Sequence, residues 1–315
     1  MTNPNSDGIA GSGRPAGDNL RSITLMIVAM ACFTIVDLLI KIASRTLPVG
    51  QVMMMLGAGS IIVFWMVMAR KGEAVVMSPL LQPAVMLRNA GDFVGATSIC
   101  LALAYVPLST VGAVLQTVPL MITAVAALFL GEQVGIRRIS AILVGFAGVL
   151  FILQPAGADF DMMALLALLG AVGMTVRDVG TKLISRDLST LLLAFYASML
   201  FTVSGAVLLA VTGGASLPDG RMLLLFLVMI ALGSIGVICV TNAIRLGEMS
   251  VVSPFRYSRL LFSVAAGIVI LGEQVNAMML FGCVLTMGAG LYIWRREIIL
   301  HDRPADQVVR QIDQA

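Results

Sequence analysis

Apolar positions along the chain fall into ten windows of about twenty residues, separated by short polar segments. An α-helix of that length crosses a hydrocarbon core about 30 Å thick. The predicted fold is therefore all-α, a polytopic membrane protein of ten transmembrane helices with both termini on one side. The windows predict helices over 20–43, 49–70, 81–104, 109–130, 137–154, 160–184, 189–211, 219–244, 250–271 and 276–294.

The segments outside these helices predict the orientation. Residues 1–19 are polar and rich in Gly, Pro and Asn, so we expect a disordered tail there, and 295–315 form a second tail. Twelve Lys and Arg residues lie in the tails, the loops or the helix ends on the side of the two tails, against only Arg45 and Arg221 on the other. Because basic segments stay in the cytoplasm, both termini are predicted to be cytoplasmic and the protein to lie in the cell inner membrane.

Composition narrows the chemistry further. Of the 315 residues, 59% are apolar and 12% are charged, whereas a soluble domain is about a quarter charged. The net charge of +3 reflects the asymmetry of the loops, so nucleic acid is not an expected partner. The four cysteines show no metal or disulfide spacing, and the only histidine, His301, lies in the C-terminal tail. We therefore expect no metal, no cofactor and no catalytic residue.

The chain resembles itself at an offset of 141 residues. VDLLIKIASR at 36–45 aligns with RDVGTKLISR at 177–186, and LGEQV at 130–134 recurs at 271–275. Two distant matches in one register indicate a duplication, with five-helix repeats at 20–154 and 160–294. Since five is odd, the second repeat enters the membrane from the opposite side. Inverted repeats around a central cavity are a common construction of transporters.

Ten helices, a duplicated five-helix unit and a Gly-Glu pair that ends the fourth helix of each unit resemble the drug/metabolite transporter superfamily, in particular its EamA-type bacterial members. The resemblance covers residues 20–295 and is carried by Asp37 with Lys41 and by the two LGEQV segments. It implies two inverted five-helix bundles around a central cavity, and transport of small organic metabolites.

Ionisable side chains inside these helices are expected to face protein or a wet cavity, because each costs about 2.5–3.5 kcal/mol in a membrane. At spacings of four residues, three couples share a helical face and are expected to neutralise each other in part: Asp37 with Lys41, Arg88 with Asp92, and Asp178 with Lys182. The first and third couples are related by the repeat and lie towards opposite sides of the membrane. They are predicted to act as alternating gates; the alternative is that the lysines extend to the headgroups and the aspartates pair with them.

A surplus of positive charge indicates the substrate. Away from their ends, the predicted helices hold six cations against three anions, and Arg256 and Arg259 have no carboxylate within four residues. Guanidinium groups suit carboxylates and phosphates, so we expect an anionic or zwitterionic solute. In the alternative, these arginines pair with Asp92, Asp178 or helix-end carbonyls, and the other polar residues join helices. The predicted substrate-binding residues are Arg256, Arg259, Tyr257, Arg88, Asp92 and Gln116, of which Gln116 and Tyr257 are equivalent under the offset.

The leading prediction is a secondary transporter that moves a small organic solute across the bacterial inner membrane by alternating access. The alternatives are a membrane-embedded lipid-modifying enzyme, which would need clustered His, Cys or paired carboxylates, and a non-transporting membrane subunit, which would need larger loops. Glu132 and Glu273, in the LGEQV segments, are expected to be structural joints that reach free amides of the next helix. The expected partners are the solute and the lipid bilayer, and the sequence leaves open a homodimer.

Overall fold

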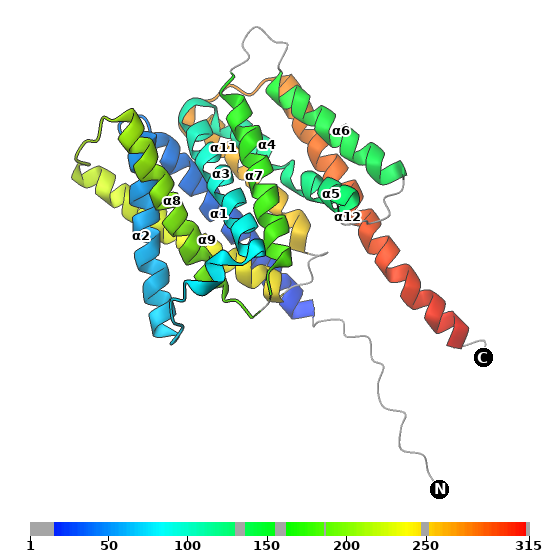
Figure 1. The fold of residues 1–315 in the computed structure, drawn as a ribbon. Coiled ribbons are helices and arrows are strands. Elements are labelled where there is room, and N and C mark those ends of the chain that lie inside the picture. Colours follow the sequence, from blue (N-terminus) through cyan, green and yellow to red (C-terminus); the bar gives the residue numbers. More distant parts are fainter. Residues whose placement is uncertain (1–15, 130–135, 155–161, 186, 247–251, 313–315) are drawn as a thin grey trace.

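The structure is a computed structural model that describes residues 16–129, 136–154, 162–185, 187–246 and 252–312, and within these ranges every regular element is a helix (Figure 1). The elements are α1 (Ala16–Ala43), α2 (Val49–Arg70), η1 (Ser78–Leu81), α3 (Pro83–Tyr105), α4 (Leu108–Leu115), α5 (Val118–Phe129), α6 (Ile136–Leu153), α7 (Ala164–Leu183), α8 (Thr190–Thr212), α9 (Gly220–Leu246), η2 (Ser253–Tyr257), α11 (Ser258–Leu271) and α12 (Ala277–Ile312).

Each of the ten predicted spans coincides with a helical segment, but two of them are interrupted. The span predicted at 109–130 is two helices, because α4 ends at Leu115 and α5 begins at Val118. The span predicted at 250–271 contains the 3-10 turn η2 ahead of α11. A proline lies in or beside each interruption, Pro119 and Pro254, and each removes a backbone donor. The two interruptions lie at equivalent positions of the two repeats, since Gln116 and Tyr257 are 141 residues apart.

The helices extend beyond the predicted spans at both termini. Helix α1 begins at Ala16, so the last residues of the predicted disordered tail at 1–19 are helical, and residues 1–15 lie outside the described part of the structure. The apolar span of α12, Ala277–Arg295, agrees with the predicted 276–294, while the helix itself continues to Ile312. Apolar windows locate the membrane-crossing part of a helix, and a polar extension of the same helix carries no such signal.

Eight of the described helical stretches are long and apolar enough to cross a membrane, among them α4 with α5 and η2 with α11, each taken as one stretch. The apolar stretch of α6, Ile139–Leu153, is shorter. Helix α3 has a comparable length but carries Arg88, Asn89 and Asp92 within about one turn, which makes it less apolar. The chain is thus a multi-pass membrane protein.

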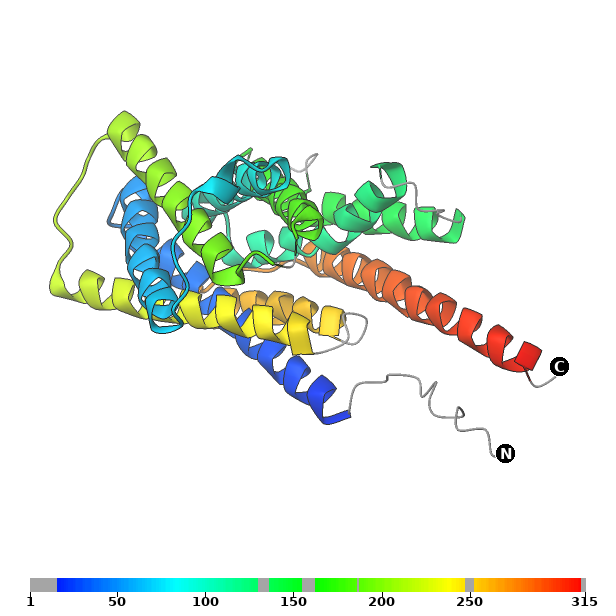
Figure 2. The same cartoon turned by 60° about the horizontal axis from the view of Figure 1, so that its bottom comes forward.

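The two halves pack against each other through equivalent helices. Helix α3 packs along α7, and α1 packs along α9. The offset relates α1 to α7 and α3 to α9, so these two contacts correspond to each other. Helix α2 packs against its own equivalent α8, and α6 against α12, on opposite sides of the bundle (Figure 1). A second view shows the α3 and α7 pair opposite the α1 and α9 pair (Figure 2).

Small residues permit the closest of these contacts. A side-chain carbon added at Gly173 of α7 would lie 2.8 Å from the Gly91 carbonyl oxygen and 2.5 Å from the Gly95 Cα, both on α3. Such distances leave no room for a side chain, as membrane helix interfaces with glycine require. This contact fixes the position of α7, which carries several of the charged residues described below.

Candidate functional site

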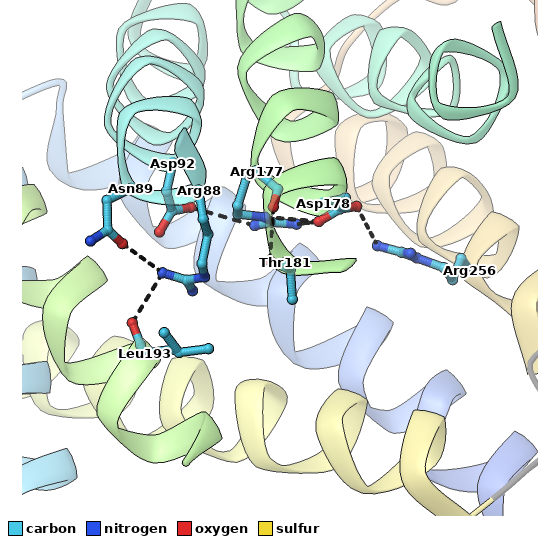
Figure 3. Close-up of polar contacts among 8 residues, drawn as sticks. All are labelled: Arg88, Asn89, Asp92, Arg177, Asp178, Thr181, Leu193 and Arg256. Carbon is cyan, nitrogen blue, oxygen red and sulfur yellow. Dashed lines mark hydrogen bonds and ion pairs between the residues drawn. The ribbon is translucent and has the colours of Figure 1, made fainter. Parts of the chain in front are cut away.

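A row of charged side chains of alternating sign runs from α3 through α7 to η2 (Figure 3). Arg177 of α7 donates from Nε and Nη2 to Asp178 Oδ1, at 2.9 and 2.8 Å, and its Nη1 lies 3.6 Å from Asp92 Oδ1 of α3. Arg256 of η2 continues the row, with Nη2 3.7 Å from Asp178 Oδ2. The four side chains are only 14% to 26% exposed. Three helical elements from both halves are therefore joined by partly buried ion pairs.

Arg88 lies at the α3 end of this row but has no carboxylate partner within the described residues. Its Nη1 donates to Asn89 Oδ1 at 2.9 Å and to the Leu193 carbonyl oxygen of α8 at 3.1 Å (Figure 3). Its buried Nε finds no acceptor in the part of the chain that the structure describes. The expected pairing of Arg88 with Asp92 is thus replaced, because the Asp92 ion pair is made with Arg177. Arg88 keeps unmet capacity to bind an anionic group.

A second ion pair joins α1 to α11. Arg259 Nη2 lies 2.6 Å from Asp37 Oδ2, and its guanidinium group lies over the Phe33 ring at 5.7 Å from the centroid. Phe33 and Asp37 are four residues apart, so one face of α1 supplies both contacts. The Arg259 and Asp37 side chains are 17% and 11% exposed.

Asp37 does not pair with Lys41, as was expected, because its carboxylate binds Arg259. Lys41 Nζ instead donates to the Leu103 and Val106 carbonyl oxygens, at 3.1 and 2.6 Å. Carbonyls at the C-terminal end of a helix such as α3 lack donors within the helix, so a lysine beside them finds ready acceptors. A spacing of four residues indicates which side chains share a helical face. It does not indicate which hydrogen-bond acceptors or charges the neighbouring helix places beside them.

The third expected couple is only partly described. Asp178 pairs with Arg177 and Arg256, while the side chain of Lys182 lies outside the described part of the structure. Both Arg177 nitrogens donate to one carboxylate oxygen, Asp178 Oδ1, and hydrogen bonds between two charged groups are stronger than those between neutral groups.

The two arginines of the interrupted helix reach one aspartate from each half. Arg256 pairs with Asp178 of α7. Arg259 pairs with Asp37 of α1. The two aspartates are equivalent under the 141-residue offset, whereas the two arginines are neighbours on one segment. Pairing with an aspartate matches the alternative considered for Arg256, and the partner of Arg259 was not anticipated.

Gln116 and Tyr257 are buried at the two helix interruptions, with 4% and 6% of their surface exposed. The Tyr257 hydroxyl lies against Gly290 of α12, where an added side-chain carbon would overlap it. It has no hydrogen-bond partner among the described residues. The structure therefore places the Tyr257 hydroxyl at a helix contact and not in the row of charges.

The substitution Tyr257→Phe is expected to leave solute uptake unchanged and to raise stability by about 1 kcal/mol, because a buried hydroxyl without a partner is removed. Uptake into proteoliposomes and thermal unfolding of the purified variant measure the two effects. A clear loss of uptake in a stably folded Tyr257→Phe variant would instead assign the hydroxyl to solute binding.

Two contributors were not given a site role from the sequence. Arg177, adjacent to Asp178, was only counted among the cations, although an arginine within an apolar helix is itself a signal. Glu273 was expected to bind amides of the next helix, and it binds those of α4 instead: the Leu108 and Ser109 amides donate to it at 2.6 and 3.0 Å. Glu132 lies outside the described residues.

The described residues contain no group of three His, Cys, Asp or Glu side chains placed to hold a metal ion. The polar interior is instead built from arginines, aspartates and backbone carbonyls. Such groups can bind charged parts of a solute and exchange ion pairs among themselves.

The sequence comparisons with known proteins find similarity to membrane transporters. The model of the EamA-like transporter family matches the chain twice, over residues 20–154 and 161–295. A riboflavin transporter of Rhizobium johnstonii is 31% identical over 204 residues, which are 64% of this chain and 67% of the relative. An S-adenosylmethionine uptake transporter of Rickettsia felis is 29% identical over 66% of this chain and 70% of its own length.

Two further similarities extend over most of the chain. The pseudopaline exporter CntI of Pseudomonas aeruginosa is 25% identical over 88% of this chain and 98% of its own length. One solved crystal structure superposes with a TM-score of 0.60 at 18% identity, covering 87% of this chain and 96% of that chain, and so shares the fold.

Proposed function

Because this chain belongs to the EamA-like transporter family, we propose that it is a secondary transporter that carries a small organic solute across the bacterial inner membrane by alternating access. The relatives named above are transporters of small metabolites. The protein is accordingly a membrane transporter and not an enzyme.

The proposed architecture has ten transmembrane helices in two inverted repeats with a cavity between them. The equivalent contacts of α1 with α9 and of α3 with α7 support it. The equivalent interruptions at Gln116 and Tyr257 support it as well, since interrupted helices at the interface of two repeats commonly form the binding site of a transporter. From the distribution of Lys and Arg, both termini face the cytoplasm and the end of the bundle at Ala43 faces outward.

One observation carries the proposed mechanism: repeat-related aspartates of the two halves pair with neighbouring arginines of one segment. Asp37 holds Arg259 and Asp178 holds Arg256. A rocking motion of the two repeats changes the distance between Asp37 and Arg259, whereas Asp178 and Arg256 belong to the same repeat and separate when η2 shifts relative to α7. The two pairs can therefore weaken in turn, which makes them contacts of alternating gates.

The proposed solute is an organic anion or zwitterion. The ion pairs described above involve Arg177, Arg256 and Arg259 with Asp37, Asp92 and Asp178, and Arg88 adds a fourth guanidinium without a carboxylate partner among the described residues. A solute carboxylate or phosphate would supply that missing partner. The proposed solute contacts are Arg88, Asp92, Arg256 and Arg259.

The class of solute can be tested by thermal stabilisation of the purified protein, followed by uptake into proteoliposomes. The panel contains amino acids, small carboxylates, organic cations, riboflavin and S-adenosylmethionine. We expect stabilisation by anions or zwitterions and not by simple cations.

The variant Arg88→Gln should raise the KM of a transported anion about tenfold, because a hydrogen bond to a charged group is lost. Equal stabilisation by organic cations, or an unchanged KM, would contradict the assignment of the solute class.

A further inference from the structure

Two charged side chains hold the turn between α3 and α4 from either flank. Lys41 Nζ binds the Leu103 and Val106 carbonyl oxygens at the end of α3. The Glu273 carboxylate accepts hydrogen bonds from the first amides of α4 and from the Ser109 hydroxyl, the last at 2.7 Å. A cation at a helix C-terminus and an anion at a helix N-terminus both interact favourably with the helix dipole.

The glutamate of this arrangement comes from the other repeat. Glu273 follows α11, which ends at Leu271 and is capped by Gly272 in the left-handed conformation, with φ at +68°. The Glu273 amide donates to the Gly267 carbonyl oxygen at 2.9 Å, so the chain turns back and presents the carboxylate to α4. The hydrogen bonds of Glu273 to α4 therefore connect the second repeat to the first.

The helices α4 and α11 are also packed tightly beside this connection. A carbon added at Gly267 would lie 3.4 Å from the Ser109 Cβ and 3.1 Å from the Glu273 Cδ. Ser263 of α11 is 1% exposed and lies against Gly112 of α4. Any opening between the repeats at this end must separate these two helices and break the hydrogen bonds of Glu273.

The exposure of the groups suits a contact that opens. Ser109 is 1% exposed, whereas Glu273 and Lys41 are only partly buried. Water can thus replace the bonds of the carboxylate without the cost of a fully buried charge. The sequence repeats the same residue types at the 141-residue offset, in Lys182, Ser250 and Glu132. Ser250, Glu132 and the side chain of Lys182 lie outside the described part of the structure.

We infer that Glu273 is a positioning residue for transport, whose carboxylate latches α4 of the first repeat to the end of α11 of the second and keeps this end of the interior closed. The inference rests on the proposed alternating access. The latch is released each time the interior opens at this end, and it forms again when the end closes. A contact that only stabilised the fold would not need to break during the transport cycle.

The latch can be tested without a substrate, through the accessibility of the α4 and α11 interface. A Ser263→Cys reporter is placed in the full chain after its four native cysteines are replaced by alanine. The Ser263 hydroxyl donates to the Leu260 carbonyl oxygen of its own helix, so the reporter removes no hydrogen bond between the halves. Adding Glu273→Gln is expected to raise the labelling rate by a water-soluble maleimide about tenfold or more, because hydrogen bonds to a charged group are lost.

The matched control is Asp219→Asn. Asp219 Oδ1 accepts a hydrogen bond from the Met222 amide at 2.8 Å and so caps α9 within the second repeat. It lies near the same end of the bundle, because Ser216 binds Gln51 at the start of α2. This control is expected to leave the labelling rate unchanged, whereas thermal unfolding shows that each variant is folded.

A labelling rate that Glu273→Gln leaves at the parent value would overturn the latch, as would an equal rise in the Asp219→Asn control. Should Glu273→Gln not fold, Ser109→Ala removes one hydrogen bond of the carboxylate and is expected to raise the labelling rate by a smaller factor. A labelling rate that Ser109→Ala leaves unchanged would then overturn the latch. Because labelling needs no solute, its result is independent of whether any tested solute is transported.

Discussion

Replacing Asp37 with asparagine is expected to abolish most transport and to lower the stability of the protein by about 3 kcal/mol, because Arg259 is left without its carboxylate. The two side chains are 11% and 17% exposed and 2.6 Å apart. Uncompensated charge in such a setting is far more costly than the loss of the attraction itself. Thermal unfolding and uptake into proteoliposomes measure the two effects.

The double variant Asp37→Asn with Arg259→Gln separates stability from gating. Removing both charges should recover most of the lost stability, since no unpaired charge remains, while transport stays low because the switchable contact is gone. The variant Asp178→Asn is a matched comparison at the repeat-related position. Its stability loss should be smaller, because Arg177 keeps a second carboxylate, Asp92, 3.6 Å away. Unimpaired transport by folded Asp37→Asn and Asp178→Asn proteins would refute the gating contacts.

The sequence predicts the helices of this protein well because a membrane-spanning helix has a simple physical requirement, a continuous apolar stretch. The apolar pattern alone does not predict the interruptions at Gln116 and Tyr257, because an interrupted apolar helix is as apolar as a continuous one. Pro119 and Pro254 are the local signals that mark them.

The charged residues were also predictable as a group, whereas their partners were not. Asp37, Asp178, Arg256 and Arg259 were recognised because an ionisable side chain in an apolar helix requires a reason. Their ion pairs join helices that are distant in the sequence, and the contact of α1 with α11 or of α7 with η2 depends on tertiary packing. Spacing along one helix therefore suggested partners within that helix, and the structure gives partners across helices.

Adding a single methyl group at Gly173 is expected to have a large effect, because the backbones of α3 and α7 touch there. The new carbon of Gly173→Ala would lie 2.8 Å from the Gly91 carbonyl oxygen, against backbone that cannot rotate away as a side chain can. Overpacking of a tight interface costs about 1–3 kcal/mol and occasionally more. We therefore expect a lower unfolding temperature in the purified variant.

The same substitution should also impair transport, since the α3 and α7 contact sets the distance between Asp92 and Arg177, already 3.6 Å. The matched control is Gly288→Ala in α12, where an added carbon meets no atom within 4 Å. There alanine should leave uptake unchanged and raise stability by up to about 1 kcal/mol through its higher helix propensity. If Gly173→Ala is as stable and as active as Gly288→Ala, the two helices do not approach as closely as described, and the row of charges that depends on their contact must be arranged differently.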